Sequence, residues 1–241
     1  MSTTVSTTVK FDNVKKVYSG DVRALNGISF EVSTGSIFAI LGPNGAGKTT
    51  TLKIIMGLIR QTDGTVSVMD KVPFPDGNKE ISFVPEEKNL YDWMKVSKMR
   101  DYFSAFAPNF SEEKFDEICK RLDLTYQRKI KALSQGNKTK LYLALALSQD
   151  VKLYLLDEPT LGLDPVVRAE VLELVKDIAK EGKTIIYSSQ ILSEVEEVCD
   201  HLLILKNGTI LYTGTMADFK GANGENLSKA FLDLVRKDEI K

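Results

Sequence analysis

A glycine-rich stretch, residues 42–50, carries groups that can bind a chain of phosphates. Its letters, GPNGAGKTT, fit the pattern G-x-x-x-x-G-K-T, in which glycines let backbone N–H groups converge on anionic oxygens. The stretch lies between an apolar run, residues 37–41, and a helical stretch, residues 51–56, so we interpret it as a phosphate loop and not as a chance turn. Lys48 adds a point charge, and the Thr49 hydroxyl suits a nucleotide-bound Mg²⁺. The predicted nucleotide-binding residues are Gly42, Pro43, Asn44, Gly45, Ala46, Gly47, Lys48, Thr49 and Thr50.

Two adjacent carboxylates, Asp157 and Glu158, follow the apolar run 151–156. Asp157 can hold Mg²⁺ through water, and Glu158 can polarise an attacking water. Acidic pairs are common where a loop begins, so the pair alone leaves a structural role open. Phosphoryl transfer needs both a phosphate cradle and a metal anchor, so the pair and the phosphate loop together predict a site for that chemistry.

Buried strands position these groups. Nearly continuous apolar runs predict strands that are covered on both faces, and helices alternate with them along the chain. This alternation predicts a parallel α/β core. The predicted strands are residues 37–41, 151–156, 184–188 and 201–205, with helices near 164–182 and 194–198, a hairpin turn at 206–209 and a final helix at 227–235.

Two segments differ from this core. Short alternating strands within residues 9–32, separated at Gly20 and Gly27, predict an antiparallel sheet that continues at residues 64–69. Residues 84–150 read as a helical insertion with helices at 98–106, 112–122 and 137–148. We therefore expect one domain, residues 1–241, in which 1–83 and 151–241 form the core with its antiparallel part and 84–150 form a helical subdomain.

The composition excludes several classes of protein. With 32 Lys and Arg against 33 Asp and Glu, the net charge of −1 gives no global attraction to nucleic acid or to an acidic membrane. The apolar runs fall short of the ~20 residues of a membrane span, and the start of the chain lacks a signal-peptide layout. Cys119 and Cys199 have no metal-ligand spacing, so we expect reduced, buried thiols. We expect a soluble cytoplasmic protein that reaches a membrane only by docking onto another polypeptide.

Three segments resemble, in order and spacing, the ATP-binding cassette of ABC transporters: residues 42–50, 133–137 (LSQGN) and 153–164 (LYLLDEPTLGLD). The resemblance covers nearly the whole chain. It implies an α/β fold with a P-loop NTPase (RecA-like) core, an antiparallel β subdomain and a helical insertion, and it implies ATP and Mg²⁺ as ligands. In that family the second segment caps a helix that faces ATP bound to the opposite subunit, which suits a hydroxyl and a small residue at a helix N-terminus. The residues implied to meet the partner or its ATP are Ser134, Gln135, Gly136, Asn137 and Asp164.

The resemblance also assigns roles to residues nearer the phosphate loop. Tyr18 by itself leaves two alternatives open, a ring stacked on a base or a half-buried tyrosine of a strand. The resemblance favours a stack on adenine. It further implies that Glu158 and Lys48 act in catalysis and that Thr49 and Asp157 bind the metal.

Two positions depart from the family pattern. Where the family has Gln after a Val-Pro pair, this chain has Glu86 followed by Glu87, and we align Glu86 with the Gln as a further oxygen near Mg²⁺. Gln190 stands where a histidine contacts the γ-phosphate; its amide can donate a hydrogen bond there but holds no proton or charge near pH 7. His201, the only histidine, begins the next predicted strand, so we expect it to be structural.

These features predict the ATP-binding and hydrolysing subunit of an ABC transporter. Two cassettes, identical or different, are expected to close on two ATP molecules, with separately encoded transmembrane subunits at the inner face of the cell membrane. The residues after Pro85 and the short C-terminal tail resemble exporters of drugs, peptides or lipids. We expect contact with the membrane subunits around residues 87–98, although the side chains there could instead pack within the insertion: Leu90, Tyr91, Trp93 and Met94.

Two other functions stay open. Gln190 suggests an ATP-gated module with slow turnover, because losing a charged transition-state contact could cost ~10²- to 10³-fold in rate. The second is a soluble ABC protein of DNA repair or translation, against which the single cassette, the short insertion and the neutral charge balance argue. The transported substrate is not predicted, because specificity is expected to lie in membrane spans outside this chain.

Overall fold

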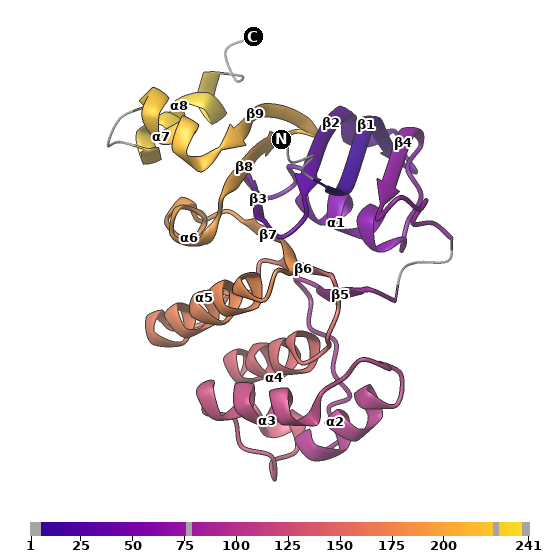
Figure 1. Ribbon diagram of the computed structural model, residues 1–241, viewed down its shortest axis with the longest axis vertical. Coiled ribbons are helices and arrows are strands. Elements are labelled where there is room, and N and C mark those ends of the chain that lie inside the picture. Colours follow the sequence, from indigo (N-terminus) through magenta and orange to yellow (C-terminus); the bar gives the residue numbers. More distant parts are fainter. Residues whose placement is uncertain (1–5, 76–78, 224–226, 238–241) are drawn as a thin grey trace.

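The computed structural model describes residues 6–75, 79–223 and 227–237, whose strands form two sheets (Figure 1). The larger sheet has the order β5-β6-β7-β3-β8-β9, and its neighbouring strands are parallel except for β8 and β9. The predicted parallel core is therefore confirmed. Its strands are β3 (Ile37–Leu41), β5 (Ile81–Val84), β6 (Leu153–Asp157), β7 (Thr184–Ser189), β8 (His201–Lys206) and β9 (Thr209–Thr215).

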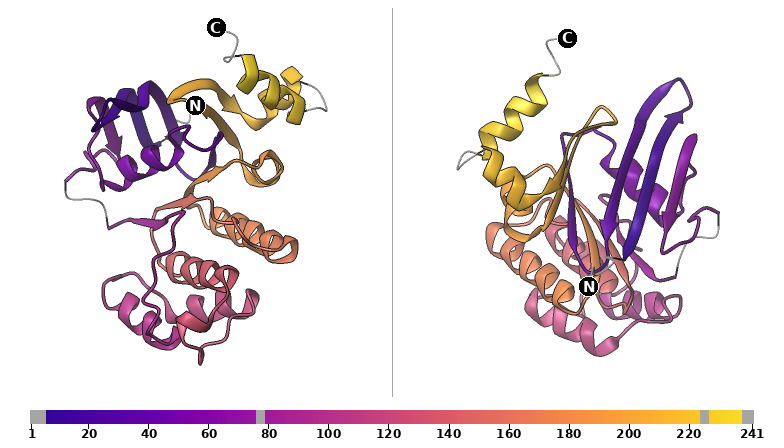
Figure 2. Two further views of the ribbon diagram at one scale, coloured as in Figure 1. Left: turned by 180° about the vertical axis from the view of Figure 1, so that it is seen from behind. Right: turned by 45° about the horizontal axis from the view of Figure 1, so that its top comes forward.

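Strand β3 lies near the centre of this sheet, and its alternate side chains enter two separate cores. Ile37, Ala39 and Leu41 pack on one face with helices α5 (Pro165–Lys180), α6 (Leu192–Val198), α7 (Met216–Asn223) and α8 (Leu227–Lys237). Phe38 and Ile40 pack on the other face with helix α1 (Lys48–Met56) and the smaller sheet. Figure 2 shows this layering, with α5 to α8 on one side of the larger sheet and the smaller sheet on the other.

The smaller sheet is antiparallel, as predicted, with the order β2-β1-β4. Its strands are β1 (Thr7–Tyr18), β2 (Val22–Ser33) and β4 (Asp63–Val68). The expectation that Gly27 separates two strands is wrong, because β2 continues through it. Gly27 has a φ of 77°, and a Cβ there would lie 2.8 Å from Asn13 Oδ1, beside register shifts between β1 and β2. Glycine at this position permits a bulge within the strand and does not end it.

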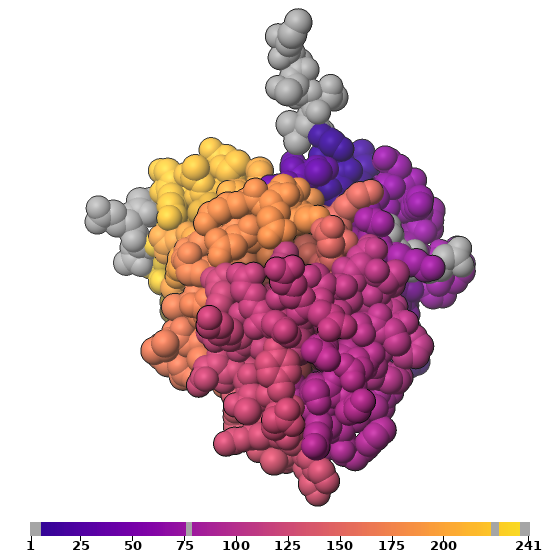
Figure 3. Space-filling view, turned by 60° about the horizontal axis from the view of Figure 1, so that its bottom comes forward, coloured from indigo at the N-terminus to yellow at the C-terminus, as the bar shows by residue number. Residues whose placement is uncertain are grey.

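The helical part at the lower end of Figure 1 contains α2 (Val96–Ser104), α3 (Glu112–Arg121), the 3₁₀ turn η1 (Ile130–Ala132) and α4 (Gln135–Leu147). The three predicted helices are present, with ends shifted by one or two residues. This part packs directly against α5 and forms a continuous surface with it (Figure 3). Arg121 Nε and Nη1 lie 2.6 Å from Glu170 and 3.1 Å from Asp177 of α5, so ion pairs join the helical part to the core.

Smaller predictions also have clear outcomes. Helix α8 contains the predicted helix at 227–235, whereas α7 was not among the predicted helices. Cys119 and Cys199 are free and buried, as expected. Within the described ranges, none of the helices combines the length and apolar character needed to cross a bilayer.

Candidate functional site

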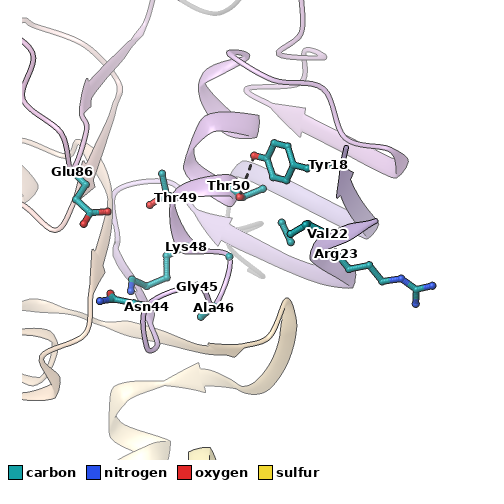
Figure 4. Close-up of a pocket in the computed structure, with 12 residues that line it drawn as sticks. Tyr18, Val22, Arg23, Asn44, Gly45, Ala46, Lys48, Thr49, Thr50 and Glu86 are labelled. Atoms are coloured by element: carbon teal, nitrogen blue, oxygen red, sulfur yellow. Dashed lines mark hydrogen bonds between the residues drawn. The ribbon is translucent and has the colours of Figure 1, made fainter. Parts of the chain in front are cut away.

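The phosphate loop joins the end of β3 to the start of α1 (Figure 4). At two positions of the loop, the surrounding backbone leaves no room for a side chain larger than that of glycine. A Cβ at Gly42 would lie 2.2 Å from the Leu205 carbonyl oxygen, and one at Gly47 would lie 2.6 Å from the Ala24 carbonyl oxygen. Helix α1 begins directly after Gly47, and no described side chain caps it. The first backbone N–H groups of α1 are therefore available to an anionic oxygen.

Lys48, the first residue of α1, meets Glu158 across the sheet edge. Lys48 Nζ lies 3.0 Å from Glu158 Oε1, and only 6% and 5% of the two side chains are exposed. The same nitrogen donates hydrogen bonds to the carbonyl oxygens of Gly42, at 2.8 Å, and Pro43, at 3.3 Å. Two predicted site residues 110 positions apart in the chain are thus in direct contact, because β3 and β6 both pair with β7 in parallel.

Asp157, the last residue of β6, has one satisfied and one open carboxylate oxygen. Ser188 Oγ of β7 donates to Asp157 Oδ1 at 2.5 Å. Asp157 Oδ2 is buried and has no hydrogen-bond partner among the residues that the structure describes. A buried, unpartnered carboxylate oxygen is costly unless a cation compensates it, so the residue fits the predicted Mg²⁺.

Glu158 has an unusual backbone and an unusual carboxyl group. Its φ of 45° lies in the left-handed region, and its N–H donates to the Ser188 carbonyl oxygen at 3.2 Å. Burial raises the pKa of Glu158, while the ion pair with Lys48 and the backbone N–H of Gln190 oppose that shift. A carboxyl group whose pKa is raised is a better proton acceptor than an ordinary glutamate, which suits it to take a proton from water.

A cavity of about 380 Å³ opens above the phosphate loop and reaches Tyr18 (Figure 4). The Tyr18 hydroxyl lies 3.3 Å from Thr50 Oγ1, and 38% of the residue is exposed. Lys16 Nζ lies 5.1 Å from the ring centroid. An exposed ring beside the phosphate loop is placed where an adenine could stack on it. The cavity also includes Val22 and Arg23, which the sequence did not suggest, although Arg23 points away from the loop.

The segment 133–137 lies elsewhere in the chain. Ser134 caps α4 by accepting the Asn137 N–H at 3.2 Å, and Ser134 and Gln135 are exposed. Asp164 is also exposed and caps α5, with its Oδ1 accepting N–H groups at 3.0 and 3.1 Å. None of these residues is among the described residues that line the cavity above the loop. A single chain therefore does not bring them to its own phosphate loop.

Residues 25–161, which hold the phosphate loop, Asp157 and Glu158, match the family model described as ABC transporter. The chain belongs to this family. An uncharacterised ABC transporter ATP-binding protein of Methanocaldococcus jannaschii is 37% identical over 219 residues, covering 87% of this chain and 78% of that protein. A linearmycin resistance ATP-binding protein of Bacillus subtilis is 32% identical over 242 residues, covering 93% and 78%. A Nod factor export ATP-binding protein of Burkholderia orbicola is 34% identical over 215 residues, covering 86% and 70%.

Solved structures of similar cassettes share the fold. An ATP-binding subunit of an ABC transporter superposes with a TM-score of 0.84 at 27% identity, covering 94% of this chain and 98% of that one. A dimeric ATP-binding cassette in a post-hydrolysis state, bound to ADP and Pi, superposes with a TM-score of 0.78 at 25% identity, covering 86% and 98%. The predicted P-loop NTPase fold is therefore confirmed.

The two departures from the family pattern lie at different edges of the cavity. Glu86 enters the cavity lining from the loop after β5, on the far side of Thr49 and Lys48 (Figure 4). Gln190 follows β7 directly and is exposed, and its backbone N–H acts to lower the pKa of the Glu158 carboxyl. His201 is distant from both, because it pairs with Phe38 near the start of β3 while the phosphate loop leaves the other end. It cannot substitute for a histidine at position 190.

Lys88 is a site residue that the sequence reasoning missed. Its Nζ donates to the Glu158 carbonyl oxygen at 3.4 Å. Burial lowers the pKa of Lys88, while the carboxylates of Asp157, Glu86 and Glu158 oppose that shift. A basic residue two positions after Glu86, in an otherwise acidic stretch, was the signal available in the sequence.

Proposed function

We propose that this cassette hydrolyses ATP to drive an ABC transporter and that it works as a pair of cassettes. The observation that carries the proposal is the buried 3.0 Å contact of Lys48 with Glu158, beside the open oxygen of Asp157. This arrangement gathers a cation for phosphates, a carboxylate for water and an oxygen for a metal at one edge of the sheet. Phosphoryl transfer requires these three groups together.

Each group has a role that follows from its chemistry. Lys48 and the backbone of the phosphate loop bind the outer phosphates, and Tyr18 stacks on the adenine. Glu158 takes a proton from the attacking water at a carboxylate oxygen. Thr49 Oγ1, Asp157 Oδ2 and the Glu86 carboxylate are the oxygens that would hold Mg²⁺, which supplies charge neutralisation to the phosphates when bound.

A second cassette supplies the remaining contacts. Ser134, Gln135, Gly136 and Asn137 begin a helix whose N-terminus faces solvent, a suitable site for the γ-phosphate of a partner's ATP. Two exposed apolar side chains flank Asp164, with Leu161 44% and Val166 80% exposed. The similar cassette that was solved as a dimer with ADP and Pi supports this pairing.

The partners in the membrane are proposed to be separately encoded transmembrane subunits at its cytoplasmic face. In the segment 87–98, Tyr91 and Trp93 are 46% and 71% exposed and offer apolar anchors, whereas Leu90 and Met94 pack against the helical core. The relatives named for Nod factor export and linearmycin resistance support export as the direction of transport.

Gln190 favours a second candidate, an ATP-gated module that closes on ATP with little turnover. Steady-state phosphate release separates the two functions. For the ATPase, Glu158→Gln should lower kcat by about 10²- to 10⁴-fold while ATP still binds. The matched control is Glu117→Gln, an exposed carboxylate on α3, which should leave kcat unchanged. If the wild type binds ATP but releases phosphate no faster than Glu158→Gln, the ATP-gated module is the correct function.

A further inference from the structure

Glu194 of α6 is a buried carboxylate outside the predicted site. Only 2% of the residue is exposed. Three hydroxyl groups donate hydrogen bonds to it: Thr160 Oγ1 at 2.9 Å, Tyr187 OH at 3.0 Å and Ser189 Oγ at 3.1 Å. Arg168 Nε forms an ion pair with Glu194 Oε1 at 3.2 Å. One side chain thus contacts four residues from three parts of the core: the loop after β6, strand β7 and helix α5.

Two of these donors belong to segments with different proposed roles. Ser189 adjoins the residue proposed to contact the γ-phosphate, and Thr160 adjoins the segment proposed to meet the second cassette. Ser189 immediately precedes Gln190. The Ser189 carbonyl oxygen accepts the Gly42 N–H at 3.3 Å, and the Ser189 Oγ also accepts the Ile191 N–H at 3.0 Å. Thr160 lies between Glu158 and the segment 161–164, in which Leu161, Gly162 and Asp164 are exposed. Glu194 therefore joins the loop that would sense the γ-phosphate to the segment that would meet the partner.

Arg168 provides a second connection to the same segment. Its backbone N–H donates to the Asp164 carbonyl oxygen at 2.9 Å, one helical turn earlier in α5. The Arg168 guanidinium also contacts Glu194, so the ion pair links the first turn of α5 to the same carboxylate that binds Thr160 and Ser189. A displacement of Asp164 must therefore alter either this ion pair or the Thr160 hydrogen bonds.

The burial of Glu194 makes its contacts with Ser189 and Thr160 costly to break. A buried carboxylate is tolerated only when donors saturate it, so its partners cannot separate without a large penalty. Ser189 and Thr160 lie 29 positions apart in the sequence and share no hydrogen bond that is not made through Glu194 in the described structure. Motion of one is transmitted to the other through this side chain.

We propose that Glu194 is a positioning residue that couples the loop at residue 190 to the partner-facing residues 160–164. The proposal rests on the proposed function, because it assumes that ATP bound at Lys48 drives pairing of two cassettes. Glu194 itself does not touch the nucleotide cavity, whose described lining excludes it. Its effect should therefore fall on pairing and turnover and not on the first ATP-binding step.

The test measures three quantities for Glu194→Gln, Thr160→Val and Ser189→Ala: the Kd of the monomer for ATP, kcat, and ATP-dependent pairing in a Glu158→Gln background. Each variant should keep its Kd within about threefold and lose at least about tenfold in pairing and kcat. In a double-mutant cycle, Thr160→Val and Ser189→Ala should be non-additive, because both act through one carboxylate.

Thr184→Val is the matched control, because Thr184 is also buried but its hydroxyl contacts Thr8 and Gly35 at the start of β7. It should change the thermal midpoint without changing pairing. Equal losses in ATP affinity and pairing, additive effects of the two donor variants, or unchanged pairing in folded Glu194→Gln would each overturn the coupling while leaving the ATPase intact. If the Glu158→Gln parent itself fails to pair with ATP, the proposed pairing and the coupling are both overturned.

Discussion

The nucleotide chemistry of this cassette is divided between a buried region and an exposed region. Lys48 and Glu158 are 6% and 5% exposed and form an ion pair within one chain. Ser134 and Asp164 are exposed and satisfy only the first N–H groups of their own helices. The fold fixes the positions of the two buried side chains, whereas the two exposed side chains are accessible to a ligand. This difference is what the proposed pairing of two cassettes would produce, because one chain would prepare the site and a second chain would complete it.

Lys48→Ala should break the buried region and give the largest effect. Phosphate release should fall by about 10³-fold, because the charge that faces the outer phosphates is lost. The variant also leaves the Glu158 carboxylate buried without its cation, which should cost about 3 kcal/mol of the free energy of unfolding. A coupled phosphate assay measures the fall in hydrolysis, and thermal unfolding measures the loss of stability.

The double variant Lys48→Ala, Glu158→Gln separates those effects. It should recover much of the thermal midpoint, because neither buried group is then charged, but it should recover none of the hydrolysis. A double variant as unstable as Lys48→Ala would contradict the assignment of the ion pair as the cause.

Gln190→His should have a smaller effect, in the opposite direction. A histidine can place a proton and a charge near the γ-phosphate, so kcat should rise by up to about 10²-fold. Gln127→His, on an exposed loop, is the control. An unchanged kcat would mean that Gln190 does not limit turnover.

The smallest expected effect is a change with pH in the difference in thermal midpoint between Glu158→Gln and the wild type. The pKa of Glu158 in the folded chain is raised above its ordinary 4.5 because burial disfavours the charged form. The protonated carboxyl therefore contributes stability that is fully present below the unfolded pKa and lost as pH rises through the folded pKa. The difference in thermal midpoint between variant and wild type should grow over that interval. A difference that shrinks as pH rises would mean that attraction to Lys48 outweighs burial.

The phosphate loop could be predicted because its function is local. Consecutive residues between one strand and one helix create both the cradle and the positive helix end, so spacing alone encodes them. The apolar runs likewise encoded the parallel strands, since both faces of those strands are covered. Gly27 shows the limit of such reasoning: glycine breaks many strands, yet here it accommodates Asn13 in a bulge.

The contacts between distant segments could not be predicted in the same way. Strand β5 is only four residues long, too short to show a period, and is identified by its pairing with β6. The ion pair of Lys48 with Glu158, the hydrogen bond of Lys88 and the cluster around Glu194 all depend on which strands are neighbours. Lys88 and Glu194 look like ordinary surface residues in the sequence until the topology places them beside the site and in the core.

The most direct test of a shared site is the mass of the Glu158→Gln cassette in solution, measured by light scattering with and without ATP and Mg²⁺. The matched variant adds Gly136→Asp. A Cβ at Gly136 would lie 3.6 Å from its nearest neighbour, so the fold should tolerate it, while the new charge would repel a partner's phosphate. We predict a monomer without ATP, a dimer with ATP, and a monomer under both conditions for Gly136→Asp, Glu158→Gln. A Glu158→Gln chain that binds ATP yet stays monomeric, or a Gly136→Asp variant that pairs equally well, would contradict the account.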